Sequence, residues 1–257
     1  MRSAKLFFTF AGVMLVCAQL SFAQEAPKDQ LFTIREEVVK VDQWDKYEST
    51  SKQWAELMTQ GGLDIPYVRA SQRDDGHYYY VSPVSNYAAV DNFPKVFGSA
   101  IDKIGKEKWA DFMIEFESTI STHRDFIVKW SAEYSYVPKE PRLKEGEAKF
   151  VHWMFFHFKL EKRKELLELM KEWKKLYTDK NISDGYEIWM VEFGLDNDSM
   201  VLTEYYKDGA DFYNRDKEIT AMIKDQADAL WAKMSPLLTN IEHKYGKFRP
   251  DLDYVKK

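Results

Sequence analysis

An internal duplication constrains the fold of this 257-residue chain more than any other feature of its sequence. When the chain is aligned with itself at an offset of 119 residues, the segment 31–67 falls on 150–186 without a gap. Trp54 then aligns with Trp173, and several apolar positions of the two segments align as well. We therefore expect two copies of one supersecondary unit, because such a unit buries its apolar face against a neighbouring copy.

A change of offset further along the chain supports the duplication. The pair Trp109-Ala110 falls on Trp231-Ala232, but at an offset of 122. Three additional residues in the second copy are expected to lie in a turn, which Asp74-Asp75-Gly76 marks in the first copy. In the second copy the corresponding turn is the longer stretch from Gly194 to Ser199. A loop insertion in a duplicated unit predicts such a shift.

Both copies predict the same order of elements, which is a strand, a helix, two strands around a turn, a long helical region and a short extended tail. In the first copy these are expected at 31–41, 43–59, 67–72, 77–82, 87–129 and 133–137. In the second copy they are expected at 150–160, 161–179, 186–193, 199–205, 210–245 and 253–255. Apolar residues at helical spacing indicate the helices, and runs of β-branched and aromatic residues indicate the strands. Pro94 and Pro236 are expected to bend or break the two long helical regions.

This order, β-α-β-β-α with a further strand allowed at the end, resembles the ferredoxin-like unit of the dimeric α+β barrel superfamily. That group includes antibiotic-biosynthesis-type monooxygenases, NIPSNAP-like proteins and haem-handling relatives. The resemblance covers a first repeat at 24–142 and a second repeat at 143–257, and it rests on pattern rather than on a motif. It implies an α+β fold in which tandem ferredoxin-like units pack as one intrachain barrel. The two prolines of Val137–Arg142 indicate the linker between the units.

The first strand of each copy divides its side chains between two faces. The face with Phe32 and Ile34 is the more uniformly apolar one in the first copy, and we assign it to the helices. Arg35 and Glu37 are then expected to point into the barrel. From the second copy, the residues expected beside them are His152, Met154 and Phe156.

The strands that follow in the first copy contribute the rest of the predicted pocket. Tyr78 and Tyr80 share one strand face, so their hydroxyl groups either orient a ligand or reach solvent at the sheet edge. Arg69 is a candidate partner for Glu37 across the sheet. The alternative is structural, with Arg35 and Glu37 paired to each other or to Arg69, since a buried charge needs a partner in either case. Such a polar and aromatic pocket suits one small organic ligand.

The histidine pattern does not predict a metal site. His152 and His157 are five residues apart on one predicted strand, so they point to opposite faces, and no HExxH motif occurs. No cofactor is predicted. The resemblance leaves one alternative, a haem protein in which His152 or His157 is the axial ligand.

The N-terminus has the pattern of a secretory signal peptide. Arg2 and Lys5 precede an apolar run, and Ser21-Phe22-Ala23 places small residues at −3 and −1 before Gln24. The only cysteine, Cys17, lies inside this segment, so the mature chain has no thiol chemistry. A periplasmic or secreted bacterial protein is expected, and we favour a monomer.

The remaining features restrict the class of partner. The formal net charge is −5, and removal of Arg2 and Lys5 makes it more negative, so nucleic acid is not an expected partner. No later apolar run approaches 18 residues, so no further membrane span is expected. We expect an exported small-molecule-binding or accessory protein with a ligand pocket between its two repeats. The alternatives are a cofactor-independent monooxygenase-like enzyme acting on an aromatic substrate, a haem-binding or haem-degrading protein, and a barrel filled by its own side chains.

Overall fold

The computed structural model describes residues 28–144, 146–196 and 198–257, and the predicted signal at 1–23 lies outside these residues. The first repeat comprises β1 (Gln30–Val39), α1 (Trp44–Gly61), β2 (Tyr67–Arg73), β3 (His77–Val84), η1 (Tyr87–Asn92), α2 (Phe93–Ile104), α3 (Lys106–Ser118) and β4 (Ile120–Trp130). The second comprises β5 (Phe150–Phe158), η2 (Leu160–Lys162), α4 (Arg163–Asp179), β6 (Tyr186–Phe193), β7 (Ser199–Tyr206), α5 (Gly209–Met234), η3 (Ser235–Leu237) and β8 (Leu238–Phe248). A short 3₁₀ turn, η4 (Pro250–Leu252), and a last strand, β9 (Tyr254–Val255), end the chain.

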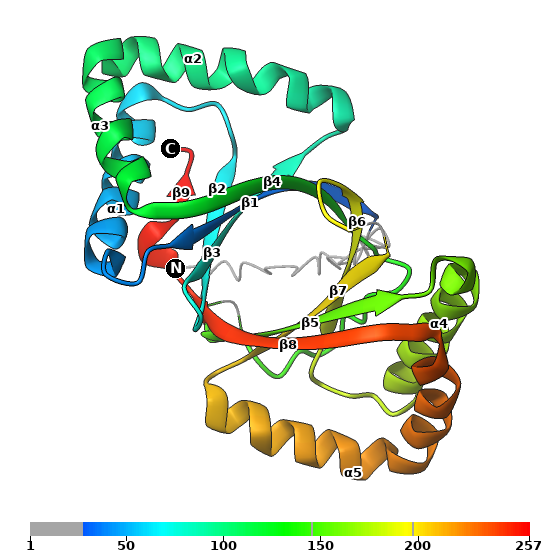
Figure 1. The fold of residues 1–257 in the computed structure, drawn as a ribbon. Coiled ribbons are helices and arrows are strands. Elements are labelled where there is room, and N and C mark those ends of the chain that lie inside the picture. Colours follow the sequence, from blue (N-terminus) through cyan, green and yellow to red (C-terminus); the bar gives the residue numbers. More distant parts are fainter. Residues whose placement is uncertain (1–27, 145, 197) are drawn as a thin grey trace, which may run out of the picture.

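Eight antiparallel strands close into one barrel in the order β3-β1-β4-β6-β7-β5-β8-β2, and the pairing of β2 with β3 completes the circle. The repeats are joined at two seams, where β4 pairs with β6 and β2 pairs with β8. Helices α1, α2 and α3 cover one side of the barrel, and α4 and α5 cover the other (Figure 1). The predicted α+β barrel of two ferredoxin-like units within one chain is confirmed.

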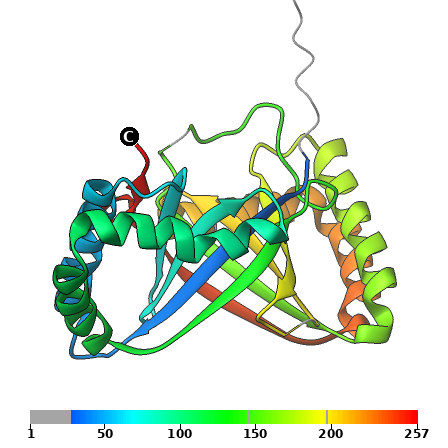
Figure 2. The ribbon, with the colours of Figure 1, turned by 90° about the horizontal axis from the view of Figure 1, so that it is seen from above.

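The ends of the two long helical regions were wrongly predicted. Ile120–Trp130 and Leu238–Phe248 are not helical but form the long strands β4 and β8 (Figure 2). β-branched residues recur in both segments, and each segment has a ladder partner along its whole length, β1 for β4 and β5 for β8. His123 and His243, which were expected on helices, therefore lie on strands.

The predicted assignment of strand faces is also wrong, in both repeats. Phe32 and Ile34 point into the barrel, where they pack with Val151 and Trp153 of the second repeat. Arg35 and Glu37 face the helices of the first repeat instead. The more apolar face of β1 is buried there because the second repeat presents an apolar surface to it, which includes Val151 and Trp153.

One charged group of β1 does lie inside the barrel. The Glu36 side chain is 2% exposed and is bound by three basic side chains. His77 Nδ1 lies 2.7 Å and Arg73 Nη1 3.8 Å from Glu36 Oε1, while Arg124 contacts Oε2. Burial opposes ionisation of this carboxyl, but the hydrogen bonds from His77 and Arg124 outweigh burial and lower its pKa to about 2.

The C-terminal segment returns to the first repeat. Arg249 binds Glu48 of α1, Gln72 of β2 and Asp251, and Tyr254 is buried against α1 and β2. None of the described helices is both long and apolar enough to cross a membrane.

Candidate functional site

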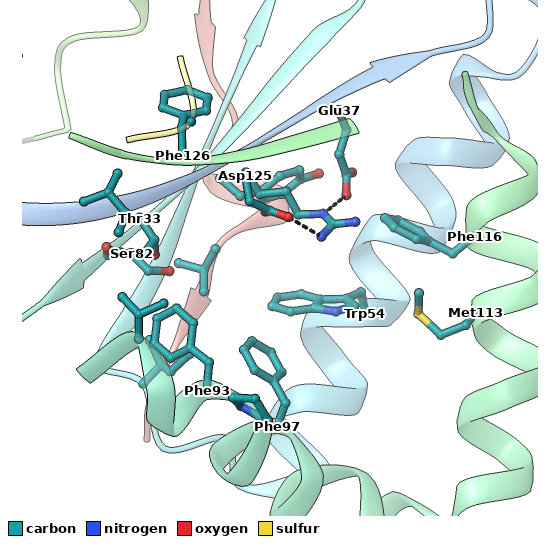
Figure 3. Close-up of a pocket in the computed structure, with 18 of the residues that line it drawn as sticks. Thr33, Glu37, Trp54, Ser82, Phe93, Phe97, Met113, Phe116, Asp125 and Phe126 are labelled. Carbon is teal, nitrogen blue, oxygen red and sulfur yellow. Dashed lines mark hydrogen bonds and ion pairs between the residues drawn. The ribbon is translucent and has the colours of Figure 1, made fainter. Parts of the chain in front are cut away.

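A cavity of about 710 Å³ lies between the outer face of the first repeat's sheet and its three helices (Figure 3). Most of its wall is apolar. The apolar wall residues are Trp54, Ile65, Val68, Val90, Phe93, Pro94, Phe97, Ile101, Trp109, Met113, Phe116, Phe126, Ile127 and Phe193. A volume of this size fits a drug-sized organic molecule.

The polar groups of the cavity gather at the strand side. Arg35 projects from β1 and donates its Nε–H to Glu37 Oε1 at 2.7 Å. Its Nη1 lies 3.3 Å from Asp125 Oδ2 of β4. Burial would lower the pKa of Arg35, but the carboxylates of Glu37 and Asp125 more than offset this, so the guanidinium stays charged. Its remaining N–H groups have no partner within 28–144, 146–196 or 198–257. The Arg35 side chain is 37% exposed and lines the cavity.

A chain of tyrosine hydroxyl groups continues from Glu37. Tyr47 of α1 is fully buried and donates to Glu37 Oε2 at 2.6 Å. The Tyr80 hydroxyl of β3 lies 2.8 Å from that of Tyr47 and 3.3 Å from Ser51 Oγ. Burial, followed by the proximity of Glu37, raises the pKa of Tyr80, and the pKa of Tyr47 is raised as well, so both phenols keep their protons at neutral pH.

Counting protons fixes the direction of these bonds. A phenol has one proton, and an ionised carboxylate only accepts. Tyr47 therefore donates to Glu37 and can only accept from Tyr80. The one proton of Tyr80 points to Tyr47 or to Ser51, and in either case none is left for the cavity that Tyr80 lines. The polar end thus offers donors from Arg35 and an acceptor oxygen from Tyr80.

The second repeat lacks the arginine and tyrosine hydroxyl groups of this polar end. Five polar residues of the first repeat have apolar counterparts at the positions given by the two offsets, whereas Thr33 and Ser82 fall on His152 and Glu204. In chain order, Arg35, Glu37, Tyr47, Ser51 and Tyr80 correspond to Met154, Phe156, Leu166, Met170 and Leu202. The strand register supports this correspondence, since Arg35 pairs with Tyr80 as Met154 pairs with Leu202. All five apolar residues belong to the packed core under α4 and α5.

The structure brings together three of the eight predicted pocket residues, Arg35, Glu37 and Tyr80. Tyr78 does not line the cavity. Its ring packs at a tilt of 55° against that of Tyr47, with the ring centroids 4.6 Å apart, and its hydroxyl donates to Glu48. Arg69 does not pair with Glu37 but with Asp253, at 2.7 Å. The structural alternative, in which Arg35 and Glu37 pair with each other, matches the observed contact.

The other three predicted residues, His152, Met154 and Phe156, belong to the second repeat and face its own helices rather than the barrel. His152 is 3% exposed, and both its ring nitrogens are engaged. Nδ1 lies 2.9 Å from Glu204 Oε2, and Nε2 lies 2.9 Å from His243 Nδ1. These residues therefore do not share a pocket with Arg35.

Four functional candidates were missed by the sequence reasoning: Tyr47, Ser51, Trp54 and Asp125. Tyr47 and Ser51 lie on the helix and Asp125 on a strand that was expected to be helical, so their convergence depends on the tertiary fold. A usable signal did exist for two of them. At the offset of 119, Tyr47 and Ser51 fall on leucine and methionine, which marks polar groups at positions where the other copy is apolar.

The two candidate axial ligands of the haem alternative, His152 and His157, do not line the cavity. None of the described residues that line the cavity is a histidine. His152 has both nitrogens bound inside the protein, and His157 Nε2 lies 3.2 Å from Glu242 at the barrel rim. His157 also has candidate metal-ligand atoms of Asp196 and Asp198 within 4.8 Å, but this group is separate from the cavity.

Comparisons with solved structures identify the fold. An anthrone oxidase-like protein matches with a TM-score of 0.62 at 6% identity, covering 90% of this chain and 95% of its own. A proposed monooxygenase from Fusobacterium nucleatum matches with a TM-score of 0.55 at 14% identity, covering 86% and 93%. A proposed monooxygenase from Lactobacillus acidophilus matches with a TM-score of 0.54 at 9% identity, covering 90% and 97%. The chain has the dimeric α+β barrel fold. No protein-family profile and no curated protein sequence matches it.

A dimeric α+β barrel needs two ferredoxin-like units, and this chain supplies both. Identities of 6 to 14% establish the shared fold alone. Within this barrel, the site is therefore defined by its own residues, and these make the two halves unequal.

Proposed function

We propose that this protein binds an apolar organic molecule carrying one hydroxyl group in the cavity of its first repeat. The observation that carries the proposal is the polar end of an otherwise apolar cavity, with Arg35 as donor and Tyr80 as acceptor. A hydroxyl group accepts one hydrogen bond and donates another, so it complements both residues at once.

The charges around the cavity favour a neutral ligand over an anion. Arg35 contributes one positive charge, but Glu37 and Asp125 bring two negative ones to the same end. A bound carboxylate would add a third negative charge beside them, and like charges at close range repel. The aromatic wall, which includes Trp54 and Trp109, favours a flat ring system.

A naphthalene series tests this ligand class. The proposal predicts that 1-naphthol binds more tightly than naphthalene, and that 1-naphthoate binds more weakly than either, as measured by quenching of tryptophan fluorescence. Arg35→Met, which introduces the residue found in the second repeat, is expected to weaken binding of 1-naphthol roughly ten- to hundredfold, the effect of losing one hydrogen bond to a charged group. It should leave naphthalene unchanged.

Arg69→Met is the matched control, since it removes an arginine of the same repeat that binds Asp253 outside the cavity. Equal affinities for 1-naphthol and naphthalene would contradict the proposed hydroxyl site. So would an equal loss of 1-naphthol affinity in Arg69→Met and Arg35→Met.

A second candidate is oxygenation of the bound molecule, and the hydroxyl chain favours it. A ligand hydroxyl can give its proton to the Tyr80 oxygen. In the same step Tyr80 gives its own proton to Tyr47, and Tyr47 gives its proton to Glu37. One proton moves in total, and the ligand oxyanion is left beside Arg35. An electron-rich oxyanion is the form of a phenol or an enol that reacts with O₂. The named activities of two structural neighbours, monooxygenase and anthrone oxidase-like, agree with this class.

Oxygen uptake with anthrone tests the enzyme. In the reaction, the ring CH₂ becomes C=O, so the substrate loses two hydrogens and gains one oxygen, and the second oxygen of O₂ leaves as water with those two hydrogens. An enzyme is expected to consume O₂ faster than buffer does, and Glu37→Gln should remove the increase. A rate equal to that in buffer would leave only the binding function.

We also propose that the protein acts outside the cytoplasm, because residues 1–23 match a secretory signal. Sequencing the N-terminus of the protein from a periplasmic or culture-medium fraction tests this. The mature chain should begin at Gln24, and a chain that keeps Met1 in the cytoplasmic fraction would contradict export.

A further inference from the structure

We propose that the N-terminal half of α2, together with η1, is a moving lid over the cavity, and that the second repeat supplies the fixed edge on which this lid closes. The inference rests on the proposed binding function of the cavity and adds the route by which a ligand enters it. Five observations on this segment and its surroundings carry the proposal.

The lid segment is weakly held by packing. Neither η1 nor the first half of α2 contains a buried residue, and Ala100 is the only buried residue of α2. Phe93, Pro94 and Phe97 line the cavity, and Phe93 and Phe97 are only half-buried where they pack against the core cluster around Met58 and Leu63. Segments with few buried apolar contacts open at low free energy.

The C-terminal half of α2 is anchored. Ala100 packs directly on Gly61 of α1, where an added Cβ would lie 2.7 Å from the Ala100 carbonyl oxygen. This close backbone contact fixes the point about which the N-terminal half can move.

A break between helices follows the anchor. Gly105 separates α2 from α3 and has φ +99°, a conformation that favours glycine. An added Cβ there would meet no atom within 4 Å, so packing does not require the glycine, whereas the backbone does. In the second repeat the corresponding helix, α5, runs through 26 residues without such a break. The helix that covers the cavity is therefore short, and its N-terminal half lies beyond the anchor at Ala100, next to η1.

The edge of the mouth is held firmly by the barrel. Phe193 and Gly194, at the end of β6, belong to the second repeat and line the cavity. β6 pairs with β4, and Gly194 is pressed against it, since an added Cβ would lie 2.6 Å from the Asp125 carbonyl oxygen. Phe193 is 61% exposed although it lines the cavity, which places it where the cavity meets solvent.

One residue latches the lid to this edge. The Tyr87 hydroxyl of η1 donates to Glu192 Oε2 at 2.6 Å, and the Tyr87 ring packs edge-on against Phe193 at 5.6 Å. Tyr87 is 45% exposed and does not line the cavity. The latch therefore controls access without contacting the bound ligand, and it acts between the two repeats.

Stopped-flow fluorescence with 1-naphthol tests the latch. Tyr87→Phe removes the hydrogen bond to Glu192 and keeps the ring. It is expected to raise the association and dissociation rates of 1-naphthol by the same factor, roughly two- to tenfold for one hydrogen bond, and to leave Kd unchanged. Tyr213→Phe, on an exposed tyrosine of α5, is the control and should change neither rate. Unchanged rates in Tyr87→Phe would overturn the latch.

Hydrogen exchange tests the motion without a ligand. The amides of 87–99 should exchange faster than those of 100–104, and faster in Tyr87→Phe than in the wild-type protein. Exchange in 87–99 as slow as that in the middle of α5 would overturn the lid. If 1-naphthol does not bind the wild-type protein at all, the proposed function fails, and hydrogen exchange still decides whether the segment opens.

Discussion

Removing one buried hydroxyl group should destabilise the protein more than the loss of an ordinary hydrogen bond. In Tyr47→Phe, Glu37 Oε2 loses the donor at 2.6 Å, and Tyr80 loses its acceptor at 2.8 Å. Glu37 is 2% exposed, so water does not easily replace the lost donor. A hydrogen bond to a charged group contributes about 1.5–3 kcal/mol. Tyr80 keeps Ser51 at 3.3 Å, so the second loss adds at most about 1 kcal/mol, and the total loss of stability is about 1.5–4 kcal/mol.

The assay is urea unfolding of Tyr47→Phe beside a matched control, Tyr136→Phe. Tyr136 is buried in the second repeat and donates to the neutral carbonyl oxygen of Ile182 at 2.7 Å. Its variant should lose about 1 kcal/mol. The denaturant slope should be the same in both variants and the wild-type protein, so that midpoints report stability. If Tyr47→Phe is no less stable than Tyr136→Phe, the carboxylate of Glu37 does not depend on this donor and the proton count at the site is wrong.

Three further predictions concern the frame around the site. The pKa of Glu36 is about 2, against an ordinary 4.5, which corresponds to about 3 kcal/mol of stability that is present above pH 4.5 and lost as the pH falls toward 2. Acid unfolding of Glu36→Gln should lack this loss. Parallel profiles of stability against pH for the variant and the wild-type protein would contradict the prediction. Arg249→Ala should cost about 2–4 kcal/mol in urea unfolding, because the 8%-exposed guanidinium binds Glu48 of α1; a smaller effect than for Arg69→Ala would contradict this. Gly194→Ala should lower the free energy of unfolding by about 1–3 kcal/mol, because φ is +89° and the new Cβ meets a backbone oxygen. Thermal melting measures this loss. Gly98→Ala, with open space around the new Cβ, is the control in the same experiment.

The sequence predicted the repeated architecture because the repeat itself carries the information. A matched offset of 119 residues needs no knowledge of which strand faces which, and it led to both the two-unit barrel and the first strand and helix of each copy. The boundary between α3 and β4 was missed for a local reason. No glycine or proline separates these elements, and the change occurs at Thr119, whose buried hydroxyl caps the helix by donating to Phe116.

The site was only partly predictable, because alternation along a strand gives two faces without saying which is inside. Arg35 and Glu37 were grouped correctly on one face of β1, and that face was then placed on the wrong side of the sheet. The apolar face with Phe32 and Ile34 packs against the second repeat inside the barrel, and this partner surface cannot be read from a single strand. Glu36 lies on the same face and is bound by Arg124 and His77 from neighbouring strands, which are likewise absent from the strand's own sequence.

The difference between the repeats explains how one fold can hold both a stable core and a binding site. A buried polar network and an open cavity each lower the free energy of unfolding relative to a packed apolar core. The second repeat has such a core, with methionine, leucine and phenylalanine at the positions where the first repeat has its polar end. The strands of both repeats close a single barrel through the β4–β6 and β2–β8 seams. The second repeat, with its packed core, therefore stabilises the first repeat, which contains the cavity. Duplication within one chain lets the halves diverge in this way, whereas two identical subunits would both carry the cavity.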